Sequence, residues 1–174
     1  MTPAERLRAR IREVPDFPRP GILFKDITPL LQDAAALQTA VDLLAEPFEG
    51  RAVDTVVGIE SRGFILGAPL ALALGAGFQP ARKAGKLPRE TLRESFELEY
   101  GNEQLEMHRD ALEPGQRVLL CDDLIATGGT AAATSRLVQR IGAEIVGAGF
   151  LVELEFLDGR RALPEIEVHS VIRY

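Results

Sequence analysis

The chain has 174 residues, with 20 Lys and Arg against 26 Asp and Glu, so its formal net charge at pH 7 is −6. This length fits a single domain that buries about 70% of the surface of its unfolded chain. The acidic balance disfavours general nucleic-acid binding, which needs a basic face. No run of about eighteen apolar residues is present, so the sequence predicts no membrane span.

The only cysteine, Cys121, excludes an internal disulfide and a cysteine-based zinc site. It lies in an apolar run, and we expect a small core residue rather than a nucleophile. Residues 1–6 include charged side chains where a secretory signal would need an apolar stretch. Together these features predict a cytoplasmic protein.

The first predicted element is an amphipathic helix over residues 2–14, with Leu7, Ile11 and Val14 on one face. Pro15 should end it, and the proline-rich segment that follows cannot be helical. Helices and buried strands then alternate, which predicts an α/β fold with a mostly parallel central sheet and flanking helices. The predicted helices are 34–45, 63–74 and 129–141, and the predicted strands are 54–59, 78–82, 117–122, 145–154 and 168–172.

Polar residues follow several of these strands directly. The segments are Glu60-Ser61-Arg62, Arg82-Lys83 and Asp122-Asp123. Ligands of parallel sheets bind beyond the carboxyl ends of the strands, so these segments should meet at one edge. Two positive clusters beside an acidic pair predict a site for an anion and a ribose.

The segment 117–130 carries the strongest signal. A Gly128-Gly129 pair before a helix lets backbone N–H groups converge on a phosphate, and Thr127 and Thr130 add hydroxyl donors. The carboxylates just before this turn can accept hydrogen bonds from vicinal hydroxyls. Each feature alone has an ordinary alternative, namely solvated carboxylates and a simple turn. The spacing matches neither a Walker A loop nor a dinucleotide fingerprint.

A short stretch rich in Lys and Arg can form a local positive patch despite the net charge. Its ordinary alternative is a solvated basic loop. The stretch contains Arg82, Lys83, Lys86, Arg89 and Arg93.

The segment 121–130 resembles the phosphoribosyl pyrophosphate (PRPP) signature of the type I phosphoribosyltransferases. Four further segments, 16–27, 60–64, 82–88 and 98–101, follow in the family's order and are similar to its adenine-specific members. The resemblance implies one domain over residues 1–174, with a small base-binding hood at about 1–33 and a mobile flap at about 87–100. It also implies that Asp122 and Asp123 contact the ribose hydroxyls, and that the 5′-phosphate is bound by Ala126, Thr127, Gly128, Gly129 and Thr130.

The resemblance further implies a pyrophosphate site and a homodimer. The Glu60–Ser61 peptide matches a bond that is often cis in this family, and Arg82 matches a residue that reaches into the neighbouring subunit's site. Ala84 stands where some relatives carry a second Arg, so this basic segment carries one positive charge fewer than theirs. The implied pyrophosphate-binding residues are Ser61, Arg62, Arg82, Lys83 and Lys86.

For the base, the resemblance implies contacts from Leu23, Phe24, Lys25 and Leu124. Phe24 offers a ring face for stacking, although an aromatic residue in an apolar run is ordinarily a core residue. Glu99 in the flap matches a proton relay at N7 of the base. The implied catalytic residues are Glu99, Arg62, Asp122 and Asp123.

The implied reaction transfers the 5-phosphoribosyl group of PRPP to N9 of adenine, giving AMP and pyrophosphate in purine salvage. Mg²⁺ would be held mainly by oxygens of PRPP, and no residue is assigned as a direct metal ligand. Two alternatives stay open. One is a transferase for a 6-oxopurine (hypoxanthine, guanine or xanthine), because Lys25 can donate to a 6-oxo group. The other is a PRPP-sensing regulator without catalysis.

Overall fold

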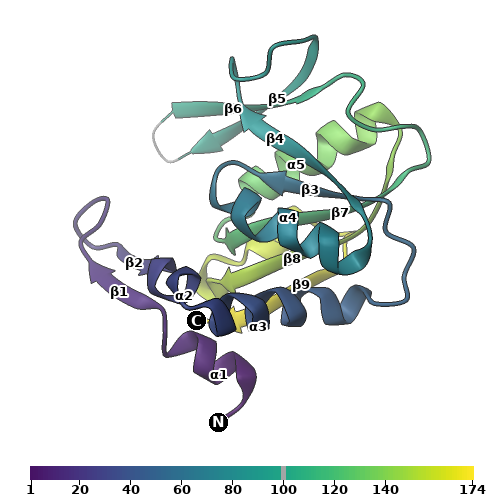
Figure 1. Ribbon diagram of the computed structural model, residues 1–174. Coiled ribbons are helices and arrows are strands. Elements are labelled where there is room, and N and C mark those ends of the chain that lie inside the picture. The colour runs from purple at the N-terminus through teal and green to yellow at the C-terminus, as the bar shows by residue number, and fades with distance from the viewer. Residues whose placement is uncertain (99–100) are drawn as a thin grey trace.

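The computed structural model describes residues 1–98 and 101–174 of the chain, and its main body is a seven-stranded sheet with helices on both faces (Figure 1). The strand order is β5-β6-β4-β3-β7-β8-β9, and β4, β3, β7, β8 and β9 run parallel to one another. The predicted α/β class with a mostly parallel sheet is confirmed. The bounds of the parallel strands are Thr55–Ile59 for β3, Gly77–Lys83 for β4, Arg117–Ile125 for β7, Glu144–Glu153 for β8 and Val168–Arg173 for β9.

Helices α3 (Ala34–Ala45) and α4 (Arg62–Leu74) cover one face of the sheet, and α5 (Gly129–Ile141) covers the other. Local signals set their ends. The Asp33 carboxylate accepts the N–H groups of Ala35 and Ala36 at 3.0 Å and so caps α3. Gly142, at φ +94°, ends α5 in the left-handed conformation. These two helices keep their predicted bounds.

The central strand β7 is buried from both sides, as predicted. Val118 and Leu120 belong to the core cluster under α5, whereas Leu119 and Cys121 belong to the cluster under α3 and α4. All four side chains are fully buried. Burial raises the pKa of the Cys121 thiol, which confirms it as a core residue rather than a nucleophile.

The N-terminal prediction was wrong in part. The first helix, α1, spans only Pro3–Arg8, and β1 (Arg12–Pro15) pairs antiparallel with β2 (Leu23–Asp26) as a separate small sheet. Val14 lies opposite Phe24 in this pairing, so its apolar spacing reflects a strand contact rather than a helix face. A short helix α2 (Thr28–Gln32) leads into α3, and short 3₁₀ helices follow at η1 (Glu46–Phe48), η2 (Glu155–Leu157) and η3 (Gly159–Ala162).

The region predicted as a flap contains regular structure that the sequence did not reveal. Strands β5 (Thr91–Leu98) and β6 (Gly101–His108) form an antiparallel hairpin, and β6 pairs with the end of β4. The hairpin thereby extends the main sheet and packs against α5 (Figure 1). Among the described residues, no helix combines the length and the apolar character that crossing a membrane requires.

Candidate active site

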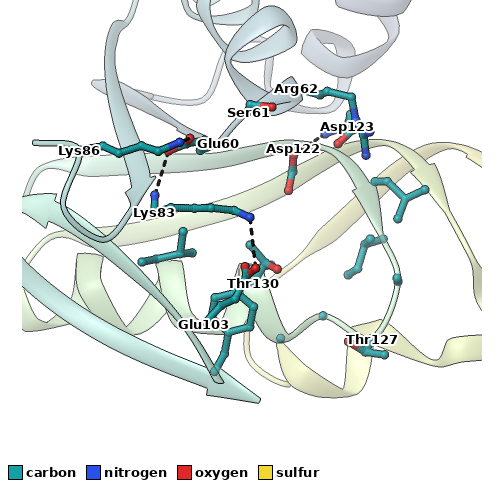
Figure 2. Close-up of a pocket in the computed structure, with 18 residues that line it drawn as sticks. Glu60, Ser61, Arg62, Lys83, Lys86, Glu103, Asp122, Asp123, Thr127 and Thr130 are labelled. Atoms are coloured by element: carbon teal, nitrogen blue, oxygen red, sulfur yellow. Dashed lines mark hydrogen bonds and ion pairs between the residues drawn. The ribbon is translucent and has the colours of Figure 1, made fainter. Parts of the chain in front are cut away.

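A cavity of about 530 Å³ lies at the carboxyl ends of β3, β4 and β7 (Figure 2). It combines the three features that the sequence suggested: an acidic pair, a glycine turn and basic side chains. Its lining includes these predicted site residues: Ser61, Arg62, Lys83, Lys86, Asp122, Asp123, Leu124, Ala126, Thr127, Gly128, Gly129 and Thr130.

The acidic pair lies inside β7 rather than after its end, which corrects the predicted boundary at residue 122. Pairing of β7 with β3 stops at Cys121, because β3 ends earlier, so the next residues border the cavity on that side. The backbone N–H of Asp123 donates to Asp122 Oδ1 at 2.8 Å, and Arg62 Nε donates to Asp123 Oδ2 at 2.6 Å. Both carboxylates are largely buried.

Helix α4 approaches this pair closely. A Cβ on Gly63 would lie 2.8 Å from Asp122 Oδ1 and 2.9 Å from the Cys121 carbonyl oxygen, so only glycine permits this contact. Burial and the neighbouring Asp123 carboxylate raise the pKa of Asp122 well above its usual value. A carboxyl group with a raised pKa, buried beside a second one, is typical of a functional site.

The two glycines of the turn 126–130 differ in what an added side chain would meet. Gly128 has φ +82°, and a Cβ there would lie 2.3 Å from the Gly159 carbonyl oxygen, so the turn itself needs glycine. At Gly129 the nearest atom to a Cβ is Phe96 Cδ2 at 3.6 Å, an ordinary contact. Gly129 begins α5, whose first N–H groups have no partner within the helix. These groups and the positive helix end lie at the cavity wall, where they can hold an anion.

The basic side of the cavity is organised by Glu60. Its carboxylate accepts a hydrogen bond from Lys86 Nζ, the backbone N–H of Lys83 at 2.9 Å and Arg82 Nε at 3.3 Å. Burial opposes ionisation of Glu60, but these donors and the two nearby cations hold its pKa below the usual value. The Glu60–Ser61 peptide bond is cis, as predicted.

Lys83 and Lys86 both line the cavity, and Figure 2 shows Lys86 directed to Glu60 and Lys83 directed to Glu103. Lys83 Nζ donates to Glu103 Oε1 on β6 at 3.2 Å. This contact connects the end of β4 to the β5–β6 hairpin. Arg82 does not line this cavity. Its guanidinium is held by Glu60 and by the Lys86 carbonyl oxygen at 3.4 Å.

The predicted base-binding segment lies in β2, outside the lining of the cavity. Phe24 is connected to the site through Arg62, whose guanidinium carbon lies 5.3 Å from the centre of the Phe24 ring. Lys25 points elsewhere: its Nζ contacts Glu13 and lies 3.8 Å from the centre of the Tyr174 ring. Leu23 is about half exposed. Glu99 lies outside the described residues, so its assigned role stays a prediction.

Six lining residues were not among the assigned site residues: Glu60, Phe96, Glu103, Leu105, Ile125 and Ala131. Glu60 belongs to a segment that its position after a predicted strand placed at the site edge, but no role was assigned to it. Ile125 and Ala131 directly flank the assigned segment 126–130, whereas Phe96 lies on β5 and Glu103 and Leu105 lie on β6. Without the pairing of that hairpin, nothing in the local sequence of these last three residues indicates that they face the site.

A model of the phosphoribosyl transferase domain matches residues 27–170 of the chain. The chain belongs to the phosphoribosyl transferase family. Within this family it is 56% identical over 170 residues to the adenine phosphoribosyltransferase of Anaeromyxobacter dehalogenans (strain 2CP-1 / ATCC BAA-258), covering 98% of this chain and 99% of that protein.

Solved structures of the family show the same fold. The adenine phosphoribosyltransferase of Rhodothermus marinus DSM 4252 superposes with a TM-score of 0.95 at 58% identity, covering 99% of this chain and 98% of the other. The Saccharomyces cerevisiae enzyme, solved with adenine and an imino-altritol bisphosphate, superposes with a TM-score of 0.92 at 42% identity. That alignment covers 97% of this chain and 98% of the yeast chain.

Proposed function

We propose that this protein is an adenine phosphoribosyltransferase, which transfers the 5-phosphoribosyl group of PRPP to N9 of adenine and releases pyrophosphate. The observation that carries this conclusion is the single cavity that joins a glycine phosphate turn, a buried carboxylate pair and two lysines. Relatives at more than half identity over nearly the whole chain bear the same name. The product AMP places the enzyme in purine salvage.

The transition state of this transfer resembles an oxocarbenium ion, as at other glycosidic centres. The residues assigned to the phosphate turn, 126–130, anchor the 5′-phosphate on the positive end of α5. Asp122 and Asp123 accept hydrogen bonds from the ribose hydroxyls, which fixes the sugar for in-line attack. Lys83 and Lys86 stabilise the charge that develops on the leaving pyrophosphate. Ser61 lines the same cavity at the N-terminus of α4 and supports this role.

Mg²⁺ fits this site as a partner of PRPP. Within the described residues, no three His, Cys, Asp or Glu side chains are grouped as a metal site. Asp122 and Asp123 are two adjacent carboxylates on the cavity wall, and they would contact a hydrated ion through water. When bound there, Mg²⁺ would neutralise negative charge on the pyrophosphate. The cytoplasmic location predicted from the sequence stays a prediction.

The base is proposed to bind between the hood and the cavity, near Phe24, Arg62 and Leu124. The direction of Lys25 supports adenine over a 6-oxopurine. Because its ammonium group is engaged with Glu13 and Tyr174, the lysine donor that a 6-oxo group would need is not offered to the site. Backbone groups of Leu23 and Lys25 remain as the proposed readers of the adenine edge.

We therefore expect kcat/KM for adenine to exceed that for hypoxanthine and for guanine by at least about thirtyfold, roughly 2 kcal/mol of discrimination. The measurement offers each base separately with PRPP and Mg²⁺ and follows nucleotide formation. Comparable values for hypoxanthine and adenine would favour the 6-oxopurine alternative. PRPP binding without any nucleotide formation would favour the sensing regulator.

The enzyme is further proposed to act as a homodimer. Three apolar residues on the outer face of α4, Ile65, Ala68 and Leu72, are exposed in the single chain, with Leu72 82% exposed. Their spacing forms one stripe along the helix, which suits burial against a second copy. Arg82 also does not line the cavity of its own chain, which is consistent with a role in the site of the partner subunit.

Complementation tests the shared site. Arg82→Ala and Asp123→Asn should each be inactive, yet a mixed dimer would hold one intact site and one with both lesions. Subunit exchange should then restore up to about half of wild-type activity per heterodimer. Lys83→Met is the matched control, because Lys83 lines its own chain's cavity. Its mixture with Asp123→Asn should show no recovery, whereas equal behaviour of the two mixtures would contradict the shared site.

A further inference from the structure

Glu106 on β6 is the most heavily hydrogen-bonded carboxylate among the described residues, and it lies outside the cavity lining. Its side chain is 1% exposed. Oε1 accepts the backbone N–H groups of Gly85 at 3.0 Å, Lys86 at 3.1 Å and Leu87 at 3.1 Å. Oε2 accepts Arg93 Nε at 3.0 Å and the Thr91 hydroxyl at 3.2 Å.

Successive N–H groups that converge in this way form a nest, which ordinarily binds an external anion. Here an internal carboxylate fills the nest. Gly85, with φ +86°, gives the loop its curvature. The Glu106 carboxylate occupies the backbone N–H groups of residues 85–87, so these groups are not offered to an external anion. The loop would therefore contact an anion through the side chain of Lys86, which lines the cavity.

Lys86 is therefore held from two sides by two carboxylates. Glu106 fixes its backbone, and Glu60 accepts from its ammonium group at the cavity wall. Glu60 and Lys86 both line the cavity, whereas Glu106 contacts the loop without lining the cavity. A change at Glu106 would thus reach a bound pyrophosphate through the position of Lys86.

The second oxygen connects this loop to the hairpin. Thr91 and Arg93 belong to β5, the strand that carries Phe96 into the cavity. Burial opposes ionisation of Glu106, but the backbone donors of the loop and the Arg93 guanidinium hold its pKa below the usual value. The ionised carboxylate therefore ties the loop that bears Lys86 to the first strand of the predicted flap.

We propose that Glu106 is a positioning residue for pyrophosphate binding: it locks the loop 85–87 against β5 and so holds Lys86 in the cavity. This inference rests on the proposed function, because it assigns Lys86 to the pyrophosphate of PRPP. Glu106 itself does not touch the substrate in this proposal. A change at Glu106 should therefore affect only the substrate that carries the pyrophosphate.

The test compares Glu106→Gln with wild type. The amide keeps the shape but replaces one acceptor oxygen by a donor, so part of the nest loses its partner. We expect KM for PRPP and the inhibition constant of pyrophosphate to rise about tenfold, with KM for adenine changed less than twofold. Glu167→Gln is the control: Glu167 also accepts hydrogen bonds from an arginine, Arg51, but it is exposed and directly precedes β9, at the opposite edge of the sheet from β5 and β6. It should leave all three constants unchanged.

A double-mutant cycle separates positioning from a general loss of structure. If Glu106 acts through Lys86, then Glu106→Gln should add less than about twofold to KM for PRPP when Lys86 is already Met. Fully additive effects would overturn the proposal, as would an equal rise in KM for adenine. Should Glu106→Gln fail to fold, Glu106→Asp retains the charge with a shorter reach and enters the same cycle. A wild-type enzyme that forms no nucleotide would refute the proposed function. An active wild type with an unaltered Glu106→Gln would refute only this inference.

Discussion

Replacing both Asp122 and Asp123 by Asn is expected to lower kcat/KM about a thousandfold, with the fold retained. Asn preserves the shape of each side chain but removes a charged acceptor. A hydrogen bond to a charged group contributes about 1.5–3 kcal/mol, and two of them account for this loss. Steady-state kinetics with saturating adenine and varied PRPP would measure it. Kinetics unchanged from wild type would show that the pair makes no contact with the ribose that matters for the reaction.

Stability provides the control for this prediction. Because the folded state raises the pKa of Asp122, the unfolded chain releases this proton at lower pH than the folded chain does. The free energy of unfolding therefore falls as pH rises above about 4, the pKa of an unperturbed Asp. Asp122→Asn removes this penalty, so the variant should be more stable than wild type at pH 7 and equal to it below about pH 4. Denaturant unfolding at both pH values measures the difference. A less stable variant at pH 7 would mean that activity was lost through the fold.

The second large effect is expected at the phosphate turn. Gly129→Val should weaken PRPP binding at least about a hundredfold, or roughly 2.7 kcal/mol, because the added methyl groups project where the phosphate approaches the first turn of α5. In the free protein the new Cβ meets nothing closer than 3.6 Å, so the melting temperature should change little. Calorimetric titration with PRPP measures the affinity, and near-normal binding would place the phosphate site elsewhere.

The neighbouring glycine supplies the contrast. Gly128→Ala must accommodate φ +82° and a Cβ 2.3 Å from the Gly159 carbonyl oxygen. The free energy of unfolding should therefore fall by about 2 kcal/mol or more, before any effect on binding is considered. The two substitutions together distinguish a glycine that the turn requires from a glycine that the ligand requires.

Local signals in the sequence were sufficient for most of the main sheet and its helices. Asp33 and Gly142 mark helix ends through interactions within a few residues, so α3 and α5 appear at their predicted positions. The unbroken apolar run 118–121 requires burial on both faces, which only a central strand satisfies. The order of the strands and the polar residues after them then predicted the site edge. Of the residues predicted to bind pyrophosphate, Ser61, Arg62, Lys83 and Lys86 line one cavity with Asp122, Asp123 and the glycine turn.

The remaining features depend on contacts between segments that are distant along the chain. Val14 has the spacing of a helix face, but its pairing with Phe24 makes it part of a strand. The β5–β6 hairpin has few apolar residues of its own, and its place is decided by pairing with β4 and packing on α5.

By itself, therefore, the sequence determined the fold class, the phosphate turn and the chemical character of the site, because these follow from periodicity, caps and motif spacing. Only the tertiary structure decided where long side chains point. The Lys25 ammonium group lies over the Tyr174 ring, and Arg62 contacts both Asp123 and Phe24. The Glu106 carboxylate accepts hydrogen bonds from the backbone of the loop that bears Lys86. A flexible charged side chain has several partners within reach, and its choice is set by burial and by the charges that folding brings beside it.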